Sequence, residues 1–368
     1  MNEYADLFQQ PRKPSADGRN DPRDPIEVYE TNAKDRRSNK WAFLLYFLVY
    51  IVLIGAMGFY FASLYPDPQA TLGNIATVSA PAFLDEGPAE GSTDRIVVFI
   101  AVLQNQNVDT VESLQLLLTF TDDAGEIVYE TTLSKDNFLS QEVWEIELSF
   151  LLPAVPADVS VQGSLYVSTL TNVLFSAAQG VLLIALFFAM QWKGLAEQGK
   201  RFVRNWKKSL SYIAIGVALV YAAVYAGSFL LQLLGINETS QNEMAIQSMF
   251  QDDALTLWLL FFTLCVAAPI TEEIVFRKAI FSFIEPKWGL APAILVSSVV
   301  FGMMHVLGGG DWIQIIPYAL MGTAFGYIYH ASGKNIWVVI VMHFVNNFFV
   351  FVLYLPVVQE LLRNAANL

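Results

Sequence analysis

Seven long apolar runs constrain this chain more than any other feature of its sequence. A helix of about 20 apolar residues crosses the roughly 30 Å of hydrocarbon in a bilayer. Only 15% of the 368 residues are charged, against about 25% in soluble domains. We therefore predict a mainly α, polytopic integral membrane protein of about seven transmembrane helices. The apolar runs are residues 41–64, 171–192, 209–235, 254–270, 289–306, 313–332 and 336–356.

Basic residues beside two of these runs predict the orientation of the chain. Lys34, Arg36, Arg37 and Lys40 precede the first run, and 193–208 holds six bases against one acid. Because basic loops stay on the cytoplasmic side, both flanks are expected there, with the N-terminus cytoplasmic. A polar N-terminus before a signal-anchor, without an organelle signal, favours a bacterial plasma membrane.

The long segment between the first two runs should then be extracytoplasmic. Residues 65–170 hold sixteen acids and two bases, which accounts for the net charge of −13 of the whole chain. The sequence from Asp122 to Gly125 is typical of a hairpin turn. The pattern predicts a small, inserted, β-sandwich-like domain, whose acidic surface is either a solvated face or a site for a cation or partner. Its expected strands are 95–103, 111–120, 126–133, 144–151 and 159–167.

Several classes of site are excluded or disfavoured by composition. Cys265 is the single cysteine, so neither an internal disulfide nor a thiolate metal cluster can form. No basic patch accompanies a nucleic-acid-binding motif, so we expect no nucleic acid partner. The His-Glu-x-x-His pattern of one large class of zinc proteases is absent.

Charged residues at the end of the fourth run are the strongest functional signal. Glu272 and Glu273 follow the apolar residues 254–270, and Arg277 comes next. On a helix, Glu273 and Arg277 share a face and can form an ion pair, whereas Glu272 lies roughly 100° away. A charge inside a membrane costs at least about 2.5–3.5 kcal/mol and is seldom idle. The alternative is that the charges merely end a span at the water interface.

Two further runs carry histidines in apolar surroundings. His305 closes Phe-Gly-Met-Met-His, and His343 stands four residues before Asn347, with Asn346 as a neighbouring alternative. Buried polar groups need partners, and the simplest partners are one another. Such a cluster could activate water at a carboxylate. Its imidazoles and amide could hold a metal or polarise a carbonyl.

Three motifs in this order carry a family resemblance. Glu272-Glu273-x-x-x-Arg277, Phe301-x-x-x-His305 and His343-x-x-x-Asn347 resemble those of the CPBP family, the CAAX-processing and bacteriocin-processing intramembrane endopeptidases, also called ABI or Rce1-like. The resemblance implies an α-helical membrane fold and hydrolysis of a peptide bond within the bilayer. It implies that Glu272 activates water. It implies that His305, His343 and Asn347 are site ligands or polarising groups. Glu273 and Arg277 would then be supporting residues.

The mechanism and the partners are open at this point. Either a metal, with zinc held by His305, His343 and Glu272, or a metal-free glutamate mechanism is compatible with the resemblance. The expected partners are the lipid bilayer and a membrane-associated peptide or protein substrate. The predicted organisation is a disordered cytoplasmic N-terminus 1–40, a first transmembrane helix 41–64, the acidic β-rich domain 65–170, transmembrane helices with a basic loop 171–250, a catalytic membrane core 251–356 and a tail 357–368.

Two other functions compete with proteolysis. A proton-coupled transporter also buries Glu, His and Arg, although no internal repeat is visible. A non-catalytic membrane scaffold or regulatory protein would keep the fold without the reaction.

One feature conflicts with a single cluster of the site side chains. Counted from Gly289, the start of its span, His305 lies about 24 Å along the helix, whereas His343 lies only about 10 Å along its own span.

Overall fold

The computed structural model describes residues 33–89, 94–236, 239–250, 253–359 and 361. The expected disorder of 1–40 and the tail 357–368 therefore fall largely outside the described residues. The chain divides into two compact units. One comprises Leu53–Phe175, and the other comprises Met1–Val52 together with Ser176–Leu368.

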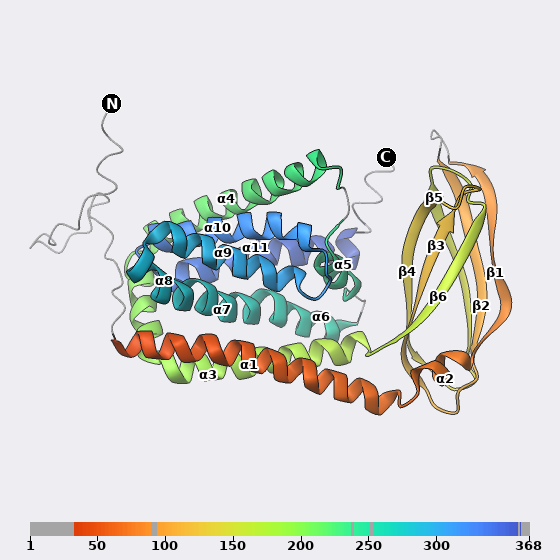
Figure 1. Ribbon diagram of the computed structural model, residues 1–368, viewed down its shortest axis with the longest axis horizontal. Helices are drawn as coiled ribbons and strands as arrows, with labels where there is room; N and C mark the ends of the chain where they lie inside the picture. The colour runs from red at the N-terminus through yellow and green to blue at the C-terminus, as the bar shows by residue number, and fades with distance from the viewer. Residues whose placement is uncertain (1–32, 90–93, 237–238, 251–252, 360, 362–368) are drawn as a thin grey trace, which may run out of the picture. The chain divides into compact units, whose positions relative to one another are not determined.

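The unit Leu53–Phe175 is built from two three-stranded antiparallel sheets (Figure 1). One sheet has the order β1-β2-β5 and the other β4-β3-β6. Side chains from both sheets, among them Phe99 and Phe120, form one buried core, as in a sandwich. The strands are β1 Ile75–Pro88, β2 Arg95–Asn105, β3 Val111–Thr121, β4 Ile127–Phe138, β5 Val143–Leu152 and β6 Asp158–Tyr166.

The prediction of five strands was right for β2 to β6 and missed β1. Strand β1 pairs along β2 with three register shifts, and such irregular pairing breaks the alternation that marks a strand in sequence. The predicted hairpin is confirmed: β3 and β4 pair as antiparallel neighbours. Gly125 in their turn has φ +81°, a conformation that glycine adopts readily.

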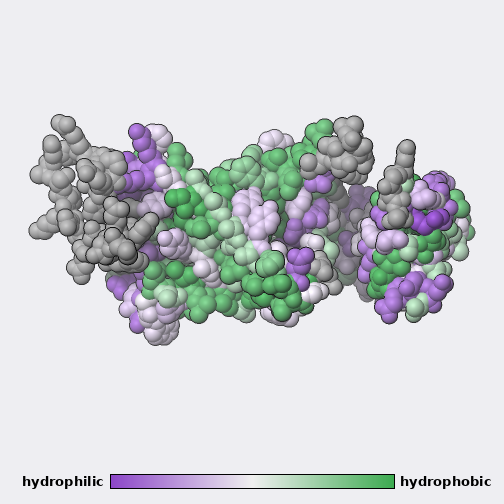
Figure 2. Space-filling model, turned by 90° about the horizontal axis from the view of Figure 1, so that it is seen from above, coloured by the Kyte–Doolittle hydropathy of each residue, from purple (hydrophilic) through white to green (hydrophobic). Residues whose placement is uncertain are grey.

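The other unit is helical. Across the described residues of the chain, five helices are long and apolar enough to cross a membrane, and α1 and α3 among them are divided between the two units. Leu290–Val306 is a shorter apolar helix, so the predicted seven spans are not confirmed. Hydrophobic residues cover the middle of the helical unit, and hydrophilic residues gather toward its ends (Figure 2). The helices include α1 Ala33–Leu64, α3 Thr169–Arg204, α4 Trp206–Leu233, α5 Gln241–Ser248, α9 Leu290–Val306, α10 Ile315–Ala331 and α11 Ile336–Tyr354.

Several helix ends differ from those predicted. Helix α1 begins at Ala33 rather than residue 41, and α3 runs on through the basic stretch to Arg204. Lysine and arginine are good helix formers, so a charged stretch can end a membrane span without ending its helix. The motif likewise lies within one helical run, Ala254–Trp288, and not after a span that stops at residue 270.

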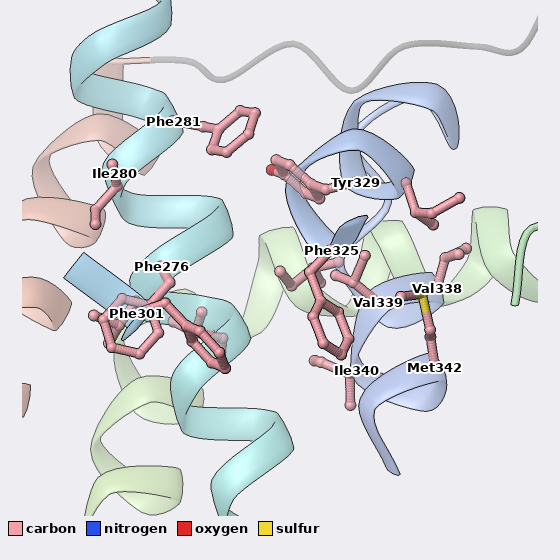
Figure 3. Packing of buried hydrophobic residues seen from close by; sticks show 14 of the residues in the cluster. Phe276, Ile280, Phe281, Phe301, Phe325, Tyr329, Val338, Val339, Ile340 and Met342 are labelled. Carbon is pink, nitrogen blue, oxygen red and sulfur yellow. The ribbon is translucent and has the colours of Figure 1, made fainter. Parts of the chain in front are cut away.

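Large apolar side chains fill the core of the helical unit, as Figure 3 shows for part of it. Phe276 meets Phe301 edge-on, with ring centroids 5.5 Å apart. Phe281 meets Tyr329 edge-on at 5.2 Å. These rings join the motif helix to α9 and α10, so the core fixes the relative positions of the three elements that carry or flank the motifs.

Candidate active site

The motif helix switches from α-helical to π-helical hydrogen bonding and back at two places along its length. It consists of α6 Ala254–Phe261, the π-helical η2 Phe262–Ala267, α7 Ala268–Glu272, the π-helical η3 Glu273–Ala279 and α8 Ile280–Trp288. Pro269 is the second residue of α7, just after η2, and its missing N–H removes one helical hydrogen bond. Short π-helical segments are frequent at functional sites, and here they flank both glutamates.

Glu273 lies in a buried group with Arg277 and His343. Arg277 Nη1 donates to Glu273 Oε1 at 3.1 Å, which confirms the predicted ion pair. His343 Nδ1 donates to the same oxygen at 2.9 Å. Glu273 and Arg277 are fully buried, and His343 is 4% exposed. The charges therefore lie inside the helical unit, which argues against the alternative that they only end a span.

Aromatic rings hold the Arg277 guanidinium. Its carbon lies 4.5 Å from the Phe301 ring centroid and 4.9 Å from that of Phe325. Its Nη2 donates to the Gly322 carbonyl at 3.3 Å. Burying an ion costs several kcal/mol, and ion pairing together with two cation–π contacts offsets that cost. We call Glu273, Arg277 and His343 the packed side of the site.

Glu272 has different surroundings. Its Oε2 is buried and has no hydrogen-bond partner among the described residues. Tyr46 and Tyr50 of α1 interact electrostatically with this carboxylate. The Tyr46 ring also meets Phe276 edge-on at 5.9 Å, so the first helix borders the site on the Glu272 side.

His305 lies between two aromatic rings on the other motif helix. Its ring centroid is 4.4 Å from that of Phe301 and 4.7 Å from that of Tyr318. His305 Nδ1 donates to the Phe301 carbonyl at 2.8 Å. The imidazole interacts electrostatically with Glu272 and His343, so the two histidines and Glu272 are brought into one region.

The predicted conflict in depth does not separate the two imidazoles. The Phe301 ring lies within 6.3 Å of the His343 ring as well as against His305. His305 is near the end of α9, whereas His343 is midway along α11. Because both imidazoles lie near the same Phe301 ring, the two helices begin at different depths.

Both histidines are engaged through Nδ1, which leaves Nε2 available. A carbonyl or carboxylate oxygen can only accept, so Nδ1 carries the proton in His305 and in His343. Nε2 of each ring then has a free lone pair for a proton, a substrate or a ligand. This shared arrangement is what a pair of acid–base or polarising groups requires.

Asn347 is tied to the motif helix. Its Nδ2 donates to the Leu264 carbonyl in η2 at 2.8 Å, and its Oδ1 accepts from Asn346 Nδ2 at 3.0 Å. The amide therefore satisfies a backbone carbonyl within the π-helical segment. An amide nitrogen has two hydrogens, so one remains for another acceptor.

Comparison with known proteins finds a family match that covers this region of the sequence. The sequence model described as "Type II CAAX prenyl endopeptidase Rce1-like" matches residues 254–349, which include all six predicted site residues. A Bacillus subtilis (strain 168) protein named "Putative membrane peptidase YdiL" is 33% identical over 174 residues, 46% of this chain and 68% of that protein. The chain belongs to the Rce1-like family.

Further relatives of this Rce1-like chain are more distant or match over less of their length. A Mycoplasma capricolum protein, named only as uncharacterized, is 32% identical over 46% of this chain and 51% of its own. A Lactococcus lactis UPF0177 protein, YbdI, is 24% identical over 42% of this chain and 83% of its own. No solved structure matches the chain significantly. The membership confirms the predicted family and does not favour the transporter or scaffold hypothesis.

The donor set of the Rce1-like site does not form a ready metal centre. Across the described ranges, no three His, Cys, Asp or Glu side chains are grouped so that they could hold a metal ion. His343 is turned through Nδ1 toward Glu273 rather than Glu272. The predicted zinc ligands His305, His343 and Glu272 therefore lack a fitting arrangement, and we derive no step through a metal.

Sequence reasoning missed the aromatic surroundings of the Rce1-like site. Phe325 and Tyr318 come from α10, which was predicted only as a span, and Tyr46 comes from α1. Aromatic residues are common in membrane helices, so their type alone gave no signal. The one sequence signal was Phe301, which opens the second motif and here contacts Arg277 and both histidines.

Helix α3 supports the start of α11, and so the position of His343. Trp337 Nε1 donates to the Leu195 carbonyl at 2.8 Å. Asn335 Nδ2 donates to the Gln198 carbonyl at 3.1 Å, and Gln198 Oε1 accepts from the Ile336 N–H at 2.9 Å. A buried hydrogen bond from Lys278 to Gln191 joins α3 to the motif helix as well.

Proposed function

We propose that the protein is an intramembrane endopeptidase that hydrolyses a peptide bond of a membrane-associated protein or peptide. The observation that carries this proposal is the contrast at the motif: Oε1 of Glu273 accepts from Arg277 and His343, whereas Glu272 has no hydrogen bond or ion pair among the described residues. Oε2 is buried without a hydrogen-bond partner in both glutamates. A carboxylate that serves as a general base must be free to accept a proton from water. Family membership supports the reaction class.

Glu272 takes a proton from a water molecule, and the water oxygen attacks the carbonyl carbon of the scissile bond. The carbonyl π electrons move to oxygen and give a tetrahedral oxyanion. Collapse of this intermediate breaks the C–N bond, and the proton held by Glu272 passes to the leaving amine. General acid–base catalysis of this kind contributes about 10²- to 10⁴-fold in rate.

The histidines and Asn347 stabilise the oxyanion. An imidazole that has taken up a solvent proton at Nε2 before the attack donates from Nε2–H to the oxyanion and returns that proton to solvent after product release. Its Nδ1–H keeps its own acceptor in His305 and in His343. Asn347 contributes its remaining amide hydrogen. Donors placed before the reaction stabilise developing charge without reorganisation, and the packed side keeps them in place.

Glu272→Ala tests this proposal with purified protein in liposomes. The substrates are matched peptides with and without a C-terminal prenyl group, since the family model is named for prenyl endopeptidases. We expect the wild type to cleave a peptide and Glu272→Ala to fold, insert and not cleave. Cleavage by Glu272→Ala at the wild-type rate would refute the assigned base, and a wild type that cleaves neither class of peptide would refute the function.

We also propose that the N-terminus is cytoplasmic in a bacterial plasma membrane and that the β-rich unit is extracytoplasmic. The bases of 193–208 support this orientation. The single native cysteine, Cys265, is buried, so an introduced cysteine reports its own side. A membrane-impermeant maleimide should label Asp109→Cys in intact cells and Lys200→Cys only after lysis. The reverse pattern would overturn the orientation.

A further inference from the structure

Tyr318 contacts His305 directly although it belongs to none of the three motifs. The two rings are stacked, with an interplanar angle of 25° and centroids 4.7 Å apart. On its other side the imidazole meets Phe301. Arg277 holds the Phe301 ring, so one of the two neighbours of His305 is fixed by the packed side and the other is Tyr318.

The hydroxyl of Tyr318 is held by the chain just before and within α5. It hydrogen-bonds the Ser240 hydroxyl at 2.7 Å and accepts from Asn242 Nδ2 at 3.2 Å. Ser240 is itself 5% exposed and caps α5, accepting from the Glu243 N–H at 3.2 Å. The phenol therefore has a donor and an acceptor in place, which fixes its ring plane.

Contacts on both sides anchor α5. At its start, the Gln241 N–H donates to Asp311 Oδ2 at 2.9 Å. At its other end, Gln247 Nε2 donates to the Tyr354 hydroxyl at 3.0 Å. The Tyr354 hydroxyl in turn donates to the Glu243 carboxylate. Helix α5 is thus connected to α10 and to α11, which carries His343.

We propose that Tyr318 is a positioning residue for His305 and that Ser240 and Asn242 set its orientation. This inference rests on the proposed endopeptidase function. The Nδ1 bond to Phe301 fixes one atom of the imidazole, and the stacked phenol restrains rotation of the ring about that bond. Together they aim Nε2 into the site. Residues 240 and 242 lie outside the family match at 254–349, so the anchor comes from beyond the shared motifs.

The test compares Tyr318→Leu, Tyr318→Phe and Asn242→Ala with Ser248→Ala. Tyr318→Leu removes the stacked ring, and we expect kcat to fall about tenfold at nearly constant KM, near the upper contribution of an aromatic pair. Tyr318→Phe and Asn242→Ala keep the ring and loosen it, so a smaller fall is expected. Ser248→Ala, at an exposed position of the same helix, removes only a local bond to the Ala245 carbonyl and should match the wild type.

A second measurement does not depend on activity. Diethyl pyrocarbonate acylates neutral imidazole nitrogens, and mass spectrometry can follow each of the three histidines. We expect Tyr318→Leu to increase the rate at His305 severalfold relative to His330, which is the internal reference. Unchanged kcat and unchanged His305 labelling in Tyr318→Leu would overturn the inference while leaving the function standing. If the leucine variant does not fold, wild-type kcat and labelling in both Tyr318→Phe and Asn242→Ala would overturn it.

Discussion

Two neighbouring carboxylates on the motif helix differ in their hydrogen-bond partners. Glu273, on the packed side, accepts hydrogen bonds from Arg277 and His343. Glu272, one residue earlier, has neither a hydrogen bond nor an ion pair in the described part of the protein, and Oε2 is buried and unpartnered in both carboxylates. We call Glu272, His305 and Asn347 the open side. One residue of rotation on a helix therefore separates a carboxylate that supports the structure from one free to react.

The difference between the two glutamates shows that charged groups inside a membrane protein can serve either stability or reaction. Charges of the packed side are neutralised by one another and covered by the rings of Phe301 and Phe325. Polar atoms of the open side keep unused capacity: an unpartnered carboxylate oxygen, the free Nε2 of His305 and an amide hydrogen of Asn347. On the packed side, the atoms without a hydrogen-bond partner are Glu273 Oε2 and Arg277 Nε, and both belong to residues that are already paired through other atoms. The packed side should therefore determine stability, and the open side should determine rate.

Matched glutamine substitutions should separate these two roles most strongly. Glu272→Gln should lower kcat about 10²- to 10⁴-fold, the contribution of a general base, with little change in Tm. Glu273→Gln should instead lower Tm, because the carboxylate that two buried donors share loses its charge. Peptide cleavage and thermal unfolding of the same samples check both. Equal effects of the two variants on Tm would contradict the division.

Removing the cation should break the packed side. Arg277→Met leaves Glu273 buried without its ion pair, and breaking such a pair costs about 3–5 kcal/mol. Denaturant unfolding in detergent micelles measures the loss. Lys200→Met, at an exposed lysine of α3, is the control for loss of a positive charge and should change the unfolding free energy little. A stability of Arg277→Met equal to that of the control would show that the pair is not structural.

Gly322 tests whether helix spacing sustains the packed side. A Cβ at Gly322 would lie 2.9 Å from Ser298 Cα and 3.3 Å from its carbonyl oxygen, so α9 and α10 would have to separate. Small residues allow such close approach of membrane helices. Gly322→Val should cost about 1–3 kcal/mol and displace the carbonyl that accepts from Arg277. Gly308→Val, where a Cβ meets nothing within 4 Å, is the control in thermal unfolding.

Chelation tests the open side. Since no three suitable donors are grouped in the described ranges, we expect a chelator to leave kcat/KM unchanged and metal analysis of the purified protein to find less than one equivalent. Loss of cleavage on chelation, with recovery on adding zinc, would show that the open side rearranges into a metal site.

An exposed ion pair in the β-rich unit gives the smallest expected effect. Arg95 donates to the Asp85 carboxylate, and this hydrogen bond lowers the pKa of Asp85. A lowered pKa means that the pair stabilises at neutral pH and that this contribution is lost as the pH falls through the folded-state pKa. Because exposed pairs contribute little, Asp85→Asn should hardly change Tm at pH 7. A loss as large as that in Arg277→Met would contradict the importance of burial.

Local sequence spacing predicted the parts of the site that depend on a single helix. The Glu273–Arg277 pair follows from a spacing of four residues, and the turn at Gly125 follows from its turn residues. The three motifs and their apolar context carried the family resemblance. These features need no knowledge of which helices are neighbours.

Contacts between distant segments could not be predicted in the same way. The hydrogen bond from His343 to Glu273 joins residues 70 positions apart, and Tyr318 meets His305 only because α9 and α10 pack closely. The periodicity of an apolar run also does not reveal a change from α- to π-helical hydrogen bonding, because the residues remain apolar throughout. The strand β1 was missed because its pairing is irregular.

The π-helical segments around the glutamates have a consequence for insertions and deletions in this gene. A π turn is commonly an α-helix that has gained one residue. Because the wider π turn absorbs the extra residue, deleting one residue within η2 would restore ordinary helical bonding there and leave α6 and α7 in their present relative rotation. The spans would remain, but ordinary helical bonding would compete with Asn347 for the Leu264 carbonyl. An in-frame deletion of one codon would thus disturb the arrangement of Asn347 and η2 while leaving the protein in the membrane.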